Sequence, residues 1–349
     1  MRLGDVLQLQ YGKPLPEEER DSSGRYAVYG ANGEKARSNR YLHDNRSIVV
    51  GRKGSAGEIK LTEEKFWPLD VTYFTTFDES RYDLNFLYYL LGTLDLPSMA
   101  RGVKPGINRN DVYALSVNIP ALPEQHRIVA LLDEAFASIA TAKAKAEKCL
   151  SSVREVEAGH RKSIFSEGGW FQTTLDRVAN NLDSRRVPIT KSDRKVGEYP
   201  YYGASGIVDY VADYIFDGDA LLVSEDGANL LARSTPIAFS VTGKYWVNNH
   251  AHILQFEDMA TQKFVEFYLE SIPLDQYITG AAQPKLNQKA LNSIPVPMPS
   301  TVSERAKVVS KIEAMKMEAQ RLESIYTRKL AALAELKQSL LQRAFSGNL

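Results

Sequence analysis

The sequence repeats itself at a distance of 173 to 180 residues, and this repeat limits what the chain can fold into. The segment Tyr29-Gly30-Ala31-Asn32-Gly33 returns as Tyr202-Gly203-Ala204-Ser205-Gly206, and Ile107-Asn108 returns as Leu286-Asn287. Solenoid repeats are about 20 to 50 residues long, so a repeat of this length indicates a whole domain. We therefore expect two similar modules related by an approximate two-fold axis.

Each module is expected to begin with a mixed α/β domain. Short runs of β-branched and aromatic residues at 47–50, 71–77, 220–223 and 253–256 are typical of strands, and residues 83–94 and 262–269 are predicted helices. The segments Ile119-Pro120-Ala121-Leu122-Pro123 and Ile294-Pro295-Val296-Pro297-Met298-Pro299 then mark the exits from the two domains. We expect that neither segment continues a strand or lies inside a helix, because proline lacks the backbone donor.

After each exit the apolar residues follow a 4,3 spacing, which is typical of a coiled-coil seam. In the second helix this spacing is interrupted only at Lys329. Small seam residues prevail in the first helix and large ones in the second, which favours pairing of the two helices with each other. The predicted seam consists of Ile128, Leu132, Ile139 and Val153 in the first helix and Val308, Ile312, Leu322, Leu333, Leu336 and Leu340 in the second.

The predicted fold is therefore α+β, with two similar mixed α/β globular domains separated by two long antiparallel coiled-coil helices. The domains are expected over residues 1–120 and 169–300, and the helices over residues 121–168 and 301–349. A helix of about 40 residues is about 60 Å long, so the pair would act as a ruler between the domains. The alternative is that each helix packs on its own domain or pairs with another chain.

Composition excludes several classes of protein. Lys and Arg number 43 and so do Asp and Glu, and this zero net charge argues against a protein that clamps nucleic acid by bulk electrostatics. The single Cys149 excludes intrachain disulfides and Cys-rich zinc sites. No 18-residue apolar run and no apolar signal-peptide stretch occur, so we expect a cytoplasmic location and no membrane partner.

Two loops of the first module suit an anionic ligand. Glycines at 51, 54 and 57 follow a predicted strand and would let the backbone approach a phosphate, although a glycine-rich turn without a ligand is the alternative. In the second copy acids replace Arg52 and Lys53, which a nucleotide site would not tolerate. A surface that reads different bases in each module would tolerate this replacement. Arginine pairs with guanine, whereas an acid accepts a hydrogen bond from the amino group of cytosine. The basic loop at 101–109 suits phosphate contacts, and Asn108 and Asn287 are expected to be helix N-caps.

The candidate DNA-binding residues combine these loops with the local basic clusters of both modules. They are Lys35, Arg37, Arg40, Arg52, Lys53, Ser55, Arg101, Lys104, Arg109, Arg185, Arg186, Lys191, Lys195, Glu225, Asp226, Asn229, Lys244, Lys285 and Lys289.

No catalytic constellation is recognisable in the sequence. No Pro-Pro dipeptide occurs, so the Asp/Asn-Pro-Pro-Tyr signature of an amino-methyltransferase is absent. The pair His250 and His252 suggests a metal, but no carboxylate cluster is indicated nearby, and a structural or base-contacting role is the stronger interpretation. We therefore expect no catalytic residue and no metal site in this chain.

The sequence resembles the specificity subunits of type I restriction-modification enzymes. The resemblance rests on the two-module plan, the loop Val49-Val50-Gly51-Arg52-Lys53-Gly54-Ser55-Ala56-Gly57, and the segments Ile119-Pro120-Ala121-Leu122-Pro123-Glu124-Gln125-His126-Arg127-Ile128-Val129 and Leu336-Lys337-Gln338-Ser339-Leu340-Leu341-Gln342-Arg343-Ala344-Phe345-Ser346-Gly347. It implies that each globular domain recognises one half of a split site in double-stranded DNA.

The same resemblance implies partners and cofactors. The helices would dock two methyltransferase subunits, which bring S-adenosylmethionine, and restriction/translocase subunits would add ATP and Mg to the complex; this chain itself would need no cofactor. Two other interpretations stay open: a coiled-coil scaffold whose globular ends bind peptides or small ligands, and an enzyme with an unrecognised site.

Overall fold

The structure, a computed structural model, describes residues 1–280 and 283–347 and divides the chain into two compact units. The first unit contains Met1–Ala146 and the C-terminal segment that begins at Arg328, and the second unit contains Glu147–Thr327. Each unit therefore combines a globular part with one portion of each long helix.

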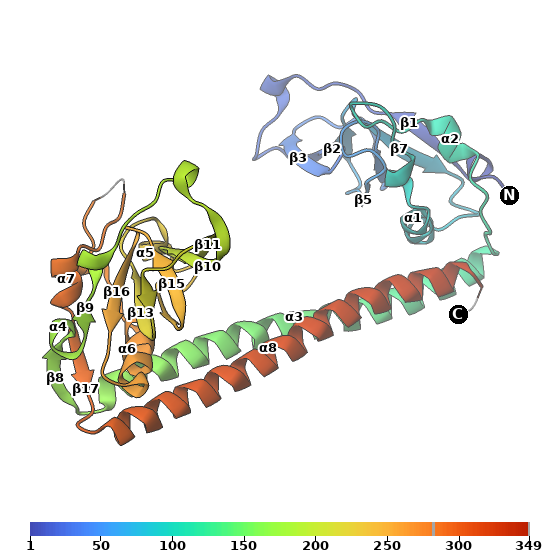
Figure 1. The fold of residues 1–349 in the computed structure, drawn as a ribbon. Helices are drawn as coiled ribbons and strands as arrows, with labels where there is room; N and C mark the ends of the chain where they lie inside the picture. Colours follow the sequence, from blue (N-terminus) through green and yellow to red (C-terminus); the bar gives the residue numbers. More distant parts are fainter. Residues whose placement is uncertain (281–282, 348–349) are drawn as a thin grey trace. The chain divides into compact units, whose positions relative to one another are not determined.

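The globular part of the first unit is built on two small sheets (Figure 1). One sheet has the antiparallel strand order β1-β7-β4-β5, and the other has the order β3-β2-β6. Helix α1 packs with the first sheet over a core of Ile48, Val50, Phe86 and Leu87. The elements are β1 (Leu7–Tyr11), β2 (Tyr26–Gly30), β3 (Gly33–Ser38), β4 (Ile48–Gly51), β5 (Ile59–Leu61), β6 (Phe66–Pro68), β7 (Thr72–Phe77), α1 (Leu84–Thr93) and α2 (Arg109–Tyr113).

The globular part of the second unit repeats this plan with one additional strand pair (Figure 1). Its sheets have the orders β14-β13-β16-β9, β11-β10-β15-β12 and β17-β8. The elements are β8 (Phe171–Thr174), α4 (Leu175–Val178), β9 (Asn180–Asn181), β10 (Val196–Gly203), β11 (Gly206–Val211), β12 (Phe216–Asp217), β13 (Ala220–Ser224), α5 (Asn229–Ala232), β14 (Ala238–Val241), β15 (Lys244–Val247), β16 (Ala251–Gln255), α6 (Met259–Ser271), α7 (Gln288–Asn292) and β17 (Pro295–Met298).

The strands and helices predicted from sequence periodicity are confirmed. The β-branched runs form β4, β7, β13 and β16, and the two periodic segments form α1 and α6. Asp83 and Asp258 cap these two helices, since each carboxylate accepts a backbone N–H of the first turn. Asn108 and Asn287 are N-caps of α2 and α7, as predicted.

The prediction that neither proline segment forms a strand or lies inside a helix is wrong for both segments. Residues Pro295–Met298 form β17, which pairs with β8 in an antiparallel, two-stranded sheet. A strand in such a sheet has a partner on one side only, so Pro295 and Pro297 can direct their missing donors away from it. At the first exit, helix α3 begins at Leu122 and includes Pro123 in its first turn, where no intrahelical donor is required.

Two long helices, α3 (Leu122–Glu167) and α8 (Val302–Phe345), contribute to both units and run antiparallel within each. In the first unit Lys337 lies 4.9 Å from the centre of the Phe136 ring, and Phe345 contacts Phe86. In the second unit Nε of Arg154 lies 2.7 Å from Oε1 of Glu323. An early residue of one helix therefore lies beside a late residue of the other.

Most of the predicted helix seam is buried or half-buried, but the prediction is wrong near the end of α8. Ile128, Leu132 and Ile312 are buried, and six further predicted residues, Ile139, Val153, Val308, Leu322, Leu333 and Leu340, are half-buried. Leu336 is 46% exposed, whereas Lys337 covers the Phe136 ring. Two seam positions thus move by one residue, because Leu330 replaces Lys329 and Lys337 replaces Leu336 on the inner face, whereas Leu333 and Leu340 stay on it.

None of the helices in the described part of the chain combines the length and the apolar character needed to cross a membrane.

Candidate nucleic-acid interface

In each unit the loop after a buried strand is joined to a proline-containing loop, and we call this contact the loop junction. In the first unit, residues 51–57 follow β4 and meet residues 101–109. The Ile107 N–H donates to Arg52 O at 3.0 Å, and the Gly54 N–H donates to Pro105 O at 2.9 Å. These bonds fix two loops that lie about fifty residues apart in the sequence.

The second unit repeats this backbone pattern bond for bond. The Leu286 N–H donates to Glu225 O at 2.8 Å, and the Gly227 N–H donates to Pro284 O at 3.0 Å. Gly54 and Gly227 both have positive φ, of 79° and 107°, a conformation that favours glycine. The sequence repeat therefore corresponds to one loop architecture that is built twice.

A ring from the neighbouring strand supports each loop junction. Tyr73 of β7 pairs with Val50, and its hydroxyl donates to Ile107 O at 3.3 Å. His252 of β16 pairs with Val223, and its Nε2 donates to Leu286 O at 2.7 Å. The two rings occupy the same place and hold the same carbonyl, although one is a phenol and the other an imidazole.

The side chains above these rings differ in charge between the two units. In the first unit the Tyr11 ring packs edge-on against Tyr73, with centres 5.1 Å apart. The guanidinium carbons of Arg52 and Arg109 lie 5.3 and 5.0 Å from the centre of the Tyr11 ring. Arg52 is held by two donations to Asp70 O, at 3.1 and 2.7 Å. The first junction therefore carries a cation–aromatic cluster.

A cleft of about 630 Å³ lies next to the first loop junction. The turn of the β2–β3 hairpin and the loop after β4 line it, and they supply Asn32, Lys35, Lys53 and Ser55. The hairpin and the loop approach closely, because a Cβ atom on Gly51 would lie 2.7 Å from the carbonyl oxygen of Ala31. Three candidates from the sequence, Lys35, Lys53 and Ser55, are thus brought together.

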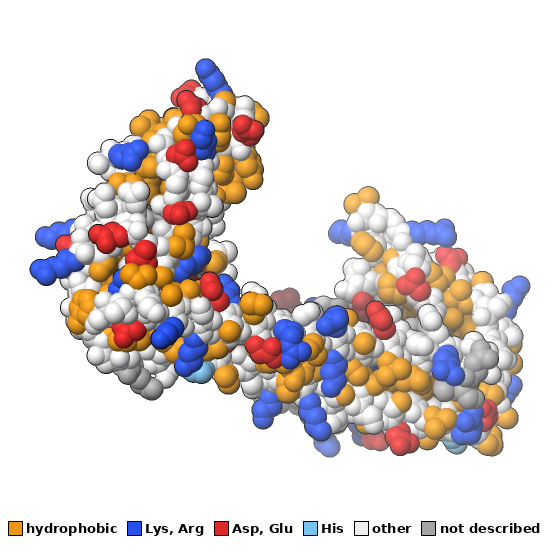
Figure 2. All heavy atoms as spheres, turned by 60° about the horizontal axis from the view of Figure 1, so that its bottom comes forward, with side chains coloured by type: hydrophobic (Ala, Val, Ile, Leu, Met, Phe, Trp, Pro, Cys, Tyr) orange, Lys and Arg blue, Asp and Glu red, His pale blue; other side chains and the backbone are white. Residues whose placement is uncertain are grey.

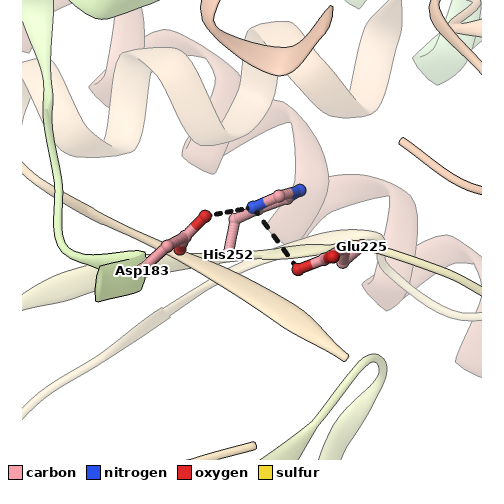
Figure 3. Close-up of side chains that lie close together, drawn as sticks. All are labelled: Asp183, Glu225 and His252. Atoms are coloured by element: carbon pink, nitrogen blue, oxygen red, sulfur yellow. Dashed lines mark hydrogen bonds and ion pairs between the residues drawn. The ribbon is translucent and has the colours of Figure 1, made fainter. Parts of the chain in front are cut away.

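In the second unit a buried ion-pair network occupies the equivalent place (Figure 3). The Asp183 carboxylate accepts from His252 Nδ1 at 2.5 Å and from the Ile253 N–H at 2.9 Å. Arg186 Nη1 lies 2.6 Å and Lys285 Nζ 3.2 Å from the Glu225 carboxylate. Asp183 replaces Tyr11 beside the ring, and Glu225 replaces Arg52 in the loop.

The network keeps both of its acids ionised. Burial acts to raise the pKa of Asp183, but the hydrogen bond and the charge of His252, with the Ile253 N–H, hold that pKa below its usual value. Burial likewise opposes ionisation of Glu225, yet Arg186, His252 and Lys285 keep its pKa lowered. Each negative charge is therefore compensated within the second unit.

Asp183, Glu225 and His252 are spaced closely enough to hold a metal ion, but their ligand atoms are already engaged (Figure 3). A carbonyl can only accept, so His252 Nε2 carries a proton toward Leu286, and Nδ1 donates to Asp183. A metal ligand needs a free nitrogen lone pair. We therefore interpret the three residues as a structural network, which agrees with the structural alternative proposed for His252 from the sequence.

The other basic candidates fall into two groups. Four are engaged with neighbours: Arg37 with Glu34 and Glu63, Arg40 with Glu19 and the Trp67 ring, Lys244 with the Tyr214 ring, and Arg185 with the Phe216 ring. Five lysines and arginines are exposed at the surface of their units, namely Arg101, Lys104, Lys191, Lys195 and Lys289.

The polar candidates of the second junction are largely occupied by partners of their own. Glu225 is 9% exposed and lies within the ion-pair network. Asp226 accepts from His250 Nδ1 at 2.9 Å, and Asn229 exchanges hydrogen bonds with Thr235. Their carboxylates and amide therefore shape the loop in the unbound chain.

Sequence reasoning missed Tyr11, Tyr73 and Asp183. Tyr11 ends the outer strand β1, and Asp183 begins the 3-10 turn that follows the outer strand β9, so only the strand pairing aligns them. On the face drawn in Figure 2, basic and acidic side chains are interspersed, with no single basic patch. Local placement of charge, rather than its total, therefore distinguishes the two junctions.

Comparison with known proteins places the chain in a family. Residues 1–149 and 167–327 match the family model described as the type I restriction modification DNA specificity domain. The EcoDI specificity subunit of the type I restriction enzyme of Escherichia coli is 24% identical, over 100% of this chain and 88% of that one. A Haemophilus influenzae protein named as a type I restriction enzyme specificity subunit is 35% identical, and the match spans 41% of this chain but only 37% of that relative.

Solved structures share the fold at low sequence identity. A structure from work on complex assembly and conformational transition of the type I R-M system matches with a TM-score of 0.79 and 15% identity, over 100% of this chain and 97% of that one. The HsdS subunit of Thermoanaerobacter tengcongensis matches with a TM-score of 0.64 and 16% identity, over 100% and 96% of the chains. The chain belongs to the type I restriction-modification DNA specificity family, carries its domain twice and is a specificity subunit of that family.

Proposed function

We propose that this chain recognises a bipartite site in double-stranded DNA, with one half-site read by the globular part of each unit. The observation that carries the proposal is the loop junction, which has the same backbone hydrogen bonds in both units but different side chains. A constant frame with variable side chains suits a surface that reads different bases in each half-site. The glycine-rich loops would present these side chains to the DNA.

The DNA-reading surface is proposed to include the candidates that cluster at the junctions. In the first unit Lys53, which lines the cleft, and Arg101 and Lys104 of the adjoining loop are exposed and would contact phosphates or base edges. In the second unit Lys285, Asp226 and Asn229 lie at the corresponding loops. Phosphate contacts would set the register of each unit, and base contacts would give specificity.

We further propose that the chain acts without an active site of its own. Two methyltransferase subunits would dock on α3 and α8, bring S-adenosylmethionine and modify adenine in each half-site. Restriction/translocase subunits would join through the same complex and contribute the ATP and Mg chemistry. The assembly would work in the cytoplasm, where the DNA of a prokaryotic cell lies.

A domain exchange tests the assignment of half-sites. Residues 169–300 are replaced by the corresponding segment of a relative with a different target, and residues 1–120 are replaced in a matched control. With the cognate methyltransferase, each exchange should change one half of the methylated site and leave the other half intact. If either hybrid still methylates the original complete site, that globular part does not read a half-site.

A further inference from the structure

Two arginines share one aromatic ring at the first loop junction. The guanidinium carbons of Arg52 and Arg109 lie 5.3 and 5.0 Å from the centre of the Tyr11 ring. Both charges are therefore close to this one ring. Neither arginine has an ion-pair partner among residues 1–280 and 283–347. An anion within reach of both guanidinium groups would be attracted by two cations that lack an acidic partner among the described residues.

The loops around this pair hold no compensating acid. Residues 51–57 and 101–109 contain five basic residues and neither aspartate nor glutamate. Arg52 is fixed by Asp70 O through Nε and Nη2, and none of the described residues accepts from its Nη1. A planar guanidinium that is held in place and still has a free N–H suits a phosphate oxygen.

The second unit has the opposite arrangement at the same place. Glu225 stands where Arg52 stands, and Gln288 follows the N-cap Asn287 as Arg109 follows Asn108. The nearby cations Arg186 and Lys285 are engaged with Glu225 at 2.6 and 3.2 Å. A phosphate here would approach two carboxylates and would have to compete for these cations.

We propose that the first unit binds a phosphodiester group of the DNA backbone between Arg52 and Arg109 beside Tyr11, and that the described residues of the second junction form no equivalent site. This inference rests on the proposed function and adds that the two loop junctions, which would face the two half-sites, differ in charge. The first junction neutralises a phosphate, and the second junction reads DNA with its charges already balanced. The first junction should accordingly contribute to the salt dependence of DNA binding, and the second junction should not.

The test measures the affinity of the complete complex, formed from the full chain and its methyltransferase subunits, for its target DNA between about 50 and 200 mM salt. The double variant Arg52→Gln with Arg109→Gln should lower the slope of log K against log[salt] by about 1, since each neutralised phosphate contributes about 0.9. The matched control is Arg81→Gln in the same unit. Arg81 also lies 5.3 Å from a tyrosine ring, that of Tyr82, but outside the junction, so the slope should not change.

A second measurement does not depend on the folding of a variant. Single methylphosphonate groups, which are uncharged, replace phosphates of the target one at a time in the presence of the unaltered complex. A methylphosphonate at one position of the first half-site should lower the slope of log K against log[salt] by about 1. A methylphosphonate at a position contacted by the second junction should not lower this slope. The double arginine variant should then lose nothing further on that modified DNA.

The outcomes separate the two proposals. If the unaltered complex binds DNA but the slope survives both the arginine and the methylphosphonate substitutions, the phosphate site is refuted and DNA recognition stands. A variant that loses discrimination at one base pair while keeping its slope also refutes it, because Arg52 or Arg109 would then read a base. If the unaltered complex shows no salt-dependent DNA binding, the proposed function itself fails.

Discussion

Replacing Asp183 with asparagine should destabilise the second unit strongly, because the buried ion-pair network depends on this carboxylate. The Asp183 side chain is 6% exposed and accepts from His252 and from the Ile253 N–H. Asparagine keeps one acceptor but turns a donating NH₂ group toward other donors. Breaking a buried pair in this way costs about 3 to 5 kcal/mol.

The cost should depend on pH in a defined direction. Since the pKa of Asp183 is lowered in the folded state, its carboxylate stabilises the fold at pH values above the unfolded pKa of about 4. This contribution disappears as the pH falls through the folded pKa, when the native carboxylate takes up its proton. The difference between Asp183→Asn and the unaltered chain should therefore be full at pH 7 and shrink in acid.

Urea unfolding followed by tryptophan fluorescence measures this cost. In a Trp67→Phe background the remaining tryptophans, Trp170 and Trp246, both lie in the second unit, so the signal reports that unit alone. The control is Asp217→Asn at an exposed position of β12, which should change the free energy of unfolding by less than about 0.5 kcal/mol. A cost for Asp183→Asn below about 1 kcal/mol, or a cost that does not shrink between pH 7 and a pH well below the unfolded pKa of about 4, would refute the network.

Three further predictions concern the first unit. Leu132→Ala should lower the free energy of unfolding in urea by about 2 to 5 kcal/mol, because Leu132 is 1% exposed. The control Leu131→Ala changes a neighbour that is 41% exposed and should cost less than about 0.5 kcal/mol. Equal costs would contradict the observed helix face. Leu333→Ala should destabilise the unit by about 1 kcal/mol more than Leu336→Ala, and equal costs would support the strict heptad seam that includes both residues. Tyr73→Phe should cost about 1 kcal/mol and speed amide hydrogen exchange at Ile107, and unchanged exchange would show that the phenol does not hold this loop.

Much of the fold could be read from the sequence because its signals are local. The strand at Ile48–Gly51 and the helix at Leu84–Thr93 follow from residue type and periodicity, and the N-cap role of Asn108 follows from its position. The repeat also placed the two glycine-rich loops in equivalent positions. The seam prediction failed at Leu336 because the inner face takes two successive steps of four residues, from Leu322 to Tyr326 and on to Leu330, where a strict heptad pattern would place Lys329.

The chemistry of the junctions could not be read in the same way, because its partners are distant in sequence. Glu225 looked like a free acceptor, yet Arg186 comes 39 residues earlier and Lys285 60 residues later, and both bind its carboxylate. Tyr11 and Asp183 become equivalent only once β1 and β9 are paired with their sheets. A pattern of charges along the chain does not show which of them neutralise each other.

The central claim is that one chain reads two separate segments of DNA. The most direct measurement is to map every methylated adenine in genomic DNA exposed to this chain together with its methyltransferase subunits. We expect one motif made of two specified segments separated by a gap of fixed length and unspecified sequence, with a modified adenine in each segment. A single uninterrupted motif, or methylation without sequence preference, would contradict the account.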